Sequence, residues 1–304
     1  MSLARRSACV VTIAAGLPYL VLKAIWLAGV PVGASTPAGA AELLDTRHLL
    51  GDLITAGMEV VAVVLALALC MRWGQRIPAL LIAGPIWLGV GLLAPIALGV
   101  PVGLAVQAVT GGSPAPADNG LQGWVYACVD GGFVLQGLAL LVGFVGYAEE
   151  RWPGVLSPQR TSVARPTVVA ATAAGVYAVA MILWSVGGRA WGGPAGFDTV
   201  TQRTFLVATG ILVLAGAIAA VAPTRNRVLI FLGAGVAVTS GPSGLALSNH
   251  GEISPPYAVV SLIAVLAGLV LAATCGPAPI GRPGDGPTGS PRTRRPAAPR
   301  PRSR

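Results

Sequence analysis

Residues 51–72 read GDLITAGMEVVAVVLALALCMR, an apolar run interrupted by two acids and closed by an arginine. About 20 mostly apolar residues are enough for a helix to cross the hydrocarbon core of a bilayer. Comparable runs recur along the whole chain. They predict eight transmembrane helices, at residues 8–30, 51–72, 77–106, 121–148, 166–187, 203–222, 227–247 and 256–275.

The composition supports the same class of protein. Of the 304 residues, 54% are hydrophobic and only 10% are charged, whereas a soluble domain carries about a quarter charged residues. This excludes a soluble enzyme, a nucleic-acid-binding module and a secreted scaffold held by disulfides. Residues 1–275 are therefore expected to form an all-α, polytopic membrane helix bundle in the plasma membrane, with the lipid bilayer as its main partner.

Arginine positions predict that both chain ends face the cytoplasm. With that orientation, Arg47, Arg189 and Arg203 are the only arginines on the outer side. All the other arginines lie on the cytoplasmic side, where the loops of membrane proteins carry an excess of positive charge. The tail, residues 276–304, is rich in proline, glycine and arginine. It is expected to be disordered in the cytoplasm and to attract anionic lipids.

The first run has a second interpretation, as a cleaved signal peptide. Arg5 and Arg6 precede it, and the small residues Ala38, Gly39 and Ala40 follow it. Because the run is as long as a membrane span, we expect the first helix to be retained.

Prolines and glycines set two further expectations. The third run holds Pro85, Pro95 and Pro101, so it is expected to kink or end early. The seventh run is expected to be broken at residues 241–244, Gly-Pro-Ser-Gly.

Short matches relate residues 8–148 to residues 166–275. Tyr19 and Trp26 recur at the same separation as Tyr177 and Trp184, and an Ala-Ala-Gly triplet precedes each pair. Either these matches arise by chance in apolar sequence, or the chain is a parallel 4+4 repeat about an axis along the membrane normal.

The most informative residues are three charges inside the predicted spans: Lys23, Glu59 and Asp130. An unpaired charge at mid-bilayer costs at least about 2.5–3.5 kcal/mol. Measured from the predicted helix ends, all three lie roughly 10–13 Å below the outer boundary. We therefore expect them to meet. One lysine cannot neutralise two acids, so one acid can hold its proton near neutral pH.

Helical spacing places polar and aromatic neighbours beside these charges. Asp52 and Thr55 continue one stripe to Glu59, and His48 begins it. Tyr19 and Trp26 share a face with Lys23, and Tyr126 and Phe133 share one with Asp130. Two interpretations remain open: ionic contacts that hold helices together, or a functional site.

No pattern indicates a cofactor or metal. His48 and His250 are interpreted as solvated loop residues; a proton-shuttle or shared metal-binding role is the alternative. The four cysteines contain no CxxC pair, and no HExxH or DDxxD motif is present.

In its size, its many spans and the acid Glu59 in the second span, the chain resembles the small actinobacterial membrane proteins that include membrane-bound terpene cyclases of indole-sesquiterpene and other meroterpenoid pathways. That resemblance implies an enzyme that protonates a lipophilic isoprenoid with intramembrane acids. The depth and helical spacing of the charges add the other expected roles: Asp130 would be catalytic as the partner acid of Glu59, with Lys23 setting their charge balance. The substrate would contact the residues Tyr19, Trp26, Asp52, Thr55, Tyr126 and Phe133. A proton- or ion-coupled transporter and a non-catalytic accessory protein are the alternatives.

Overall fold

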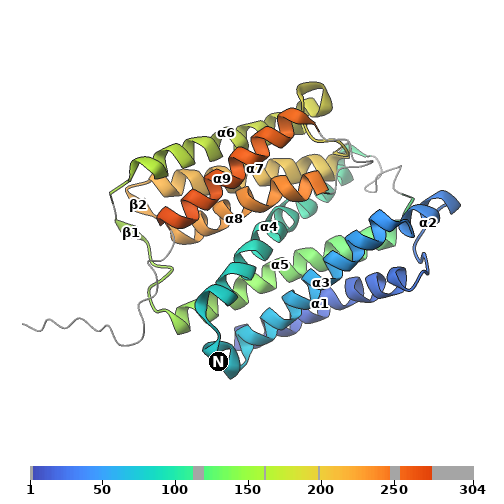
Figure 1. Ribbon diagram of the computed structural model, residues 1–304, viewed down its shortest axis with the longest axis horizontal. Helices are drawn as coiled ribbons and strands as arrows, with labels where there is room; N and C mark the ends of the chain where they lie inside the picture. Colours follow the sequence, from blue (N-terminus) through green and yellow to red (C-terminus); the bar gives the residue numbers. More distant parts are fainter. Residues whose placement is uncertain (1–2, 112–119, 161, 198, 247–253, 276–304) are drawn as a thin grey trace, which may run out of the picture.

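All eight apolar runs form long helices in the computed structural model, which describes residues 3–111, 120–160, 162–197, 199–246 and 254–275 (Figure 1). The chain is therefore an all-α, multi-pass membrane protein. The elements in order are α1 (Leu3–Leu27), α2 (Pro37–Leu43), α3 (Thr46–Cys70), η1 (Arg72–Arg76), α4 (Ala79–Thr110), α5 (Gly123–Arg151), β1 (Gln159–Arg160), α6 (Arg165–Gly187), η2 (Gly188–Trp191), α7 (Val200–Val221), β2 (Thr224–Arg225), α8 (Arg227–Ala246) and α9 (Pro255–Cys275).

The helices form two halves whose neighbours are arranged in a similar order, except that α4 contacts α3 much less than α8 contacts α7. In the first half α1 packs against α3 and α5, and α4 packs against α5. In the second half α6 packs against α7 and α9, and α8 packs against both of those. Helix α4 joins the halves through its contacts with α7 and α8 (Figure 1). A parallel repeat would produce this order, and the repeat itself stays a prediction.

Glycines allow the joining helices to approach closely. A Cβ atom on Gly91 of α4 would lie 2.5 Å from the backbone of Gly235 on α8. Likewise, a Cβ on Gly216 of α7 would lie 2.7 Å from the Cα atom of Gly233 on α8. Small residues let membrane helices gain van der Waals contact in this way.

Two helices continue where the sequence suggested that they would stop. Helix α4 runs to Thr110 with Pro85, Pro95 and Pro101 inside it, so the expectation of an early end was wrong. Helix α8 passes through Pro242 to Ala246, so the expected break at residues 241–244 was also wrong. Pro242 lies in the last turns of α8 and removes one helical hydrogen bond there, yet the helix continues to Ala246.

The first half of the bundle has two ends, the α2 end and the η1 end. The α2 end holds α2, the last residues of α1 and the start of α3; the η1 end holds η1, the start of α1 and the last residues of α3 and α5. At the α2 end the short helix α2, which the sequence analysis did not predict, begins at a Thr36 cap followed by Pro37. The tail at 276–304 and His250 lie outside the described residues.

Candidate functional site

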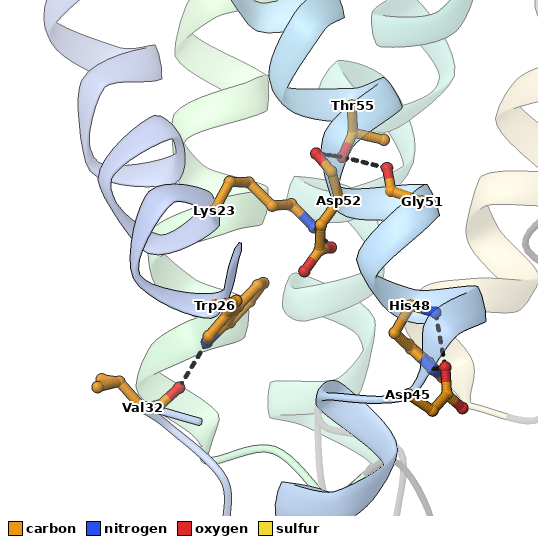
Figure 2. Close-up of polar contacts among 8 residues, drawn as sticks. All are labelled: Lys23, Trp26, Val32, Asp45, His48, Gly51, Asp52 and Thr55. Carbon is orange, nitrogen blue, oxygen red and sulfur yellow. Dashed lines mark hydrogen bonds and ion pairs between the residues drawn. The ribbon is translucent and has the colours of Figure 1, made fainter. Parts of the chain in front are cut away.

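A buried ion pair joins α1 to α3 near the α2 end. Lys23 Nζ lies 2.5 Å from Asp52 Oδ1, and the two residues are 9% and 6% exposed (Figure 2). The second oxygen, Asp52 Oδ2, is buried without a hydrogen-bond partner among the described residues. The ion pair therefore neutralises Asp52 while leaving one carboxylate oxygen unsatisfied.

Two aromatic rings surround the same ammonium group. Lys23 Nζ lies 4.9 Å from the ring centre of Tyr19 and 4.8 Å from that of Trp26, both within cation–π range. Trp26 is fixed in turn, because its indole N–H donates to the Val32 carbonyl at 2.8 Å (Figure 2). The predicted shared face of Tyr19, Lys23 and Trp26 is confirmed.

Glu59 lies deeper in the bundle and has a different partner. Gln136 of α5 donates through Nε2 to Glu59 Oε1 at 2.5 Å, and the two residues are 1% and 4% exposed. Gly16 of α1 completes the site, because a Cβ there would overlap the Glu59 carboxylate. Three helices therefore meet at one buried carboxyl group, and no described cation lies within ion-pair distance of it.

The structure does not bring Lys23, Glu59 and Asp130 into one ionic cluster. Helix α3 begins at Thr46, five residues before the predicted 51, and α1 ends at Leu27 rather than 30. These changes place Glu59 deeper and Lys23 shallower than the sequence indicated. Lys23 consequently lies level with Asp52, about 10 Å and two helical turns from Glu59.

Asp130 stands apart from both contacts. Its side chain is partly buried, and within the described ranges it makes neither an ion pair nor a hydrogen bond. One turn further along α5, the Phe133 ring meets the Tyr19 ring edge-on, with 4.8 Å between centres. Tyr19 lies between Gly16 and Lys23 along α1, so this aromatic pair separates the Lys23–Asp52 pair from Glu59.

The remaining members of the polar stripe on α3 are engaged locally. Thr55 donates its hydroxyl to the Gly51 carbonyl of its own helix at 2.9 Å (Figure 2). His48 lies inside α3 rather than in a loop, and its Nδ1 is 3.0 Å from Asp45 Oδ1. Tyr126, near the start of α5, is partly buried.

Asp45 caps α3 and carries a shifted pKa. Its carboxylate accepts the backbone N–H of His48 at 2.7 Å. That hydrogen bond favours the charged form and lowers the pKa of Asp45 below its usual 3.8. The first turn of α3 is therefore stabilised by an ionised cap.

The second half has an aromatic pair, Tyr177 and Trp184, that matches Tyr19 and Trp26 but has no charged residue between its members. Trp184 of α6 donates its indole N–H to the Trp191 carbonyl at 2.9 Å, as Trp26 does to Val32. Met181, 1% exposed, has the sequence position between Tyr177 and Trp184 that Lys23 has between Tyr19 and Trp26. Ser261 is buried at the α9 position matching Asp130.

Sequence reasoning missed two residues of this site, Gly16 and Gln136. A signal for Gln136 existed, since it is a lone amide within the apolar run 134–140 of α5. Comparison with protein-family models, curated proteins and solved structures finds no match to this chain. The geometry of α1, α3 and α5 therefore carries what can be inferred about function.

Proposed function

We propose that this chain is a plasma-membrane enzyme that starts the cyclisation of a lipophilic isoprenoid or meroterpenoid by protonating it with Glu59. One observation carries the proposal: Glu59 is a buried acid held by an amide and a glycine, while the chain's one lysine is paired with Asp52. A carboxyl group without a cationic partner in an apolar site is suited to hold and deliver a proton.

The proposed step is redox-neutral. With an alkene, the Glu59 O–H bond breaks as a C–H bond forms on one alkene carbon, and the other alkene carbon becomes cationic. With an epoxide, the proton passes to the ring oxygen, one C–O bond breaks, and the carbon released from oxygen becomes cationic. The Tyr19 and Phe133 rings, which lie between Glu59 and the Lys23–Asp52 pair, are proposed to supply negative electrostatic potential for that cation. Trp26 faces the Lys23 ammonium instead. Loss of a proton from the cyclised cation ends the reaction, and Asp130 is the proposed acceptor.

In this proposal Lys23 and Asp52 have a different part from the one that the sequence suggested. As a buried pair they hold α1 against α3, two turns from the acid. They are positioning residues, whereas Glu59 and Asp130 are the proposed catalytic residues. Thr55 is proposed only as part of the surrounding wall, since its hydroxyl bonds its own helix.

The test is product formation by purified protein in lipid nanodiscs, with prenylated indoles and their terminal epoxides as probes. Glu59→Gln should remain folded and lose cyclised product at least a hundredfold, because general acid catalysis contributes about 10²–10⁴-fold. Glu149→Gln, the same change at an exposed position of α5, is the matched control. Full turnover by Glu59→Gln overturns the proposal.

The same preparation separates the alternative functions. A transporter would move a probe into proteoliposomes under a pH gradient and leave it chemically unchanged. An accessory protein would do neither and would co-purify with a partner. The continuous helix α8 removes the discontinuous-helix argument that favoured transport.

A further inference from the structure

Two cysteines far apart in the sequence meet at the η1 end. Cys70 is the last residue of α3, and its thiol donates to the Arg5 carbonyl of α1 at 3.1 Å. In a helix that same carbonyl accepts the backbone N–H of the residue four positions later, which is Cys9. Cys9 therefore lies one turn from the contact and on the same face of α1.

The two thiols are close enough to interact directly. Both are free and partly buried. The other two cysteines lie elsewhere: Cys128 on α5 packs at the α2 end, and Cys275 is buried at the end of α9. The pair was invisible to a search for CxxC spacing because two different helices contribute it.

We propose that Cys9 and Cys70 form a dithiol site that closes reversibly into a disulfide between α1 and α3. In the step the two S–H bonds break, one S–S bond forms, and two protons and two electrons pass to a two-electron oxidant. A dithiol reductant reverses it by thiol–disulfide exchange. The inference is independent of the proposed enzymatic activity.

The position of this bond gives it a structural consequence. Helices α1 and α3 are held near the α2 end by Lys23 and Asp52. The disulfide would add a covalent link at the other end of the same two helices. Gly16 and Glu59 lie between these two contacts, so the redox state of the pair would decide whether α1 and α3 can separate around the buried acid.

The experiment counts free thiols in the full chain. Protein in nanodiscs is treated with diamide, an azo compound that takes up two hydrogens to become a hydrazine. It is then unfolded in SDS and labelled with a polyethylene-glycol maleimide that adds a visible mass per thiol. The reduced chain should gain four additions, one for each cysteine. After diamide it should gain two fewer, and dithiothreitol should restore them.

Single variants identify the pair. Cys9→Ser and Cys70→Ser should each lose no further thiol to diamide, while Cys128→Ser and Cys275→Ser, the matched controls, should still lose two. Mass spectrometry should find the peptide with Cys9 linked to that with Cys70. The proposal is overturned if the wild-type chain keeps four thiols after both diamide and the smaller oxidant iodine, or if the link joins two chains.

Discussion

Gln136 of α5 donates a hydrogen bond to Glu59 of α3 across a gap that only a glycine, Gly16 of α1, leaves open. This contact between two buried side chains ties three helices to one carboxyl group. An amide donor can hold a carboxyl oxygen without supplying a charge, so the group is oriented but not neutralised. The arrangement suits an acid that must release a proton into apolar surroundings.

The glycine is the first point at which this geometry can be tested. A Cβ on Gly16 would overlap the Glu59 carboxylate and lie 2.8 Å from Gln136 Nε2. Overpacking of this kind costs about 1–3 kcal/mol, so Gly16→Ala should lower the thermal unfolding midpoint in detergent.

Gly175→Ala is the matched control, since Gly175 closes the corresponding Ala-Ala-Gly triplet of α6 and has open space around its Cβ position. That change should stabilise α6 by roughly 0.5–1 kcal/mol, because alanine favours a helix more than glycine does. Equal effects of the two substitutions would contradict the packing described at Glu59.

The Lys23–Asp52 pair makes a second prediction, about stability. Lys23→Met should destabilise the protein by about 3–5 kcal/mol, because it leaves the Asp52 carboxylate buried without a counter-charge. Unfolding followed by circular dichroism in detergent measures the change. Methionine is chosen because Met181 is buried at the matching sequence position between Tyr177 and Trp184 of α6.

The double variant Lys23→Met, Asp52→Leu separates packing from charge. Replacing both members of a buried pair by apolar residues is often neutral, so the double variant should recover most of the lost stability. If the double variant instead lost as much free energy of unfolding as the two single variants lose together, the ion pair would not be what couples α1 to α3.

Much of this fold could be predicted from the sequence, because the bilayer imposes a length and a composition on each span. All eight helices were predicted, and their ends differ from the predicted ones by five residues or fewer. The largest error that affects the site was the start of α3. His48 and Asp52 were assigned to positions outside or at the edge of the helix, although Asp45 before them is a standard cap residue.

The partners within the site could not be predicted, for a geometric reason. Depth along a helix follows from counting residues, but a shift of three to five residues at two helix ends changed which charges lie level. The choice of Asp52 over Glu59 as the partner of Lys23 also depends on how α1 and α3 are rotated. That rotation is set by close contacts, such as those of Gly16 and Gly132.

The paired tryptophans make a third prediction, in which each half serves as control for the other. Trp26→Phe and Trp184→Phe each remove an indole N–H that donates to a carbonyl beyond the end of its own helix, that of Val32 or of Trp191. Each substitution should lower the free energy of unfolding by about 0.5–1.5 kcal/mol. Trp26→Phe should cost more, because it also weakens the cation–π contact with Lys23.

Repeating both changes in a Lys23→Met background isolates the second effect. There the cost of Trp26→Phe should fall to that of Trp184→Phe, as measured by the unfolding midpoint. An undiminished difference between the two would show that the Lys23 ammonium contributes nothing through the Trp26 ring.

The cap of α3 makes the last prediction, on pH. Because the pKa of Asp45 is lower in the folded protein than in the unfolded chain, its contribution to stability is present above the unfolded value and is lost as pH falls through the folded one. Hydrogen exchange of the first turn of α3 should therefore speed up as pH drops below about 4, beyond the change in intrinsic exchange rate.

Asp45→Asn keeps a capping oxygen and should remove this pH dependence. Thr36→Ala, which deletes the uncharged cap of α2, should loosen α2 equally at every pH. A first turn of α3 that responds to pH identically in Asp45→Asn and wild type would assign the effect to another group.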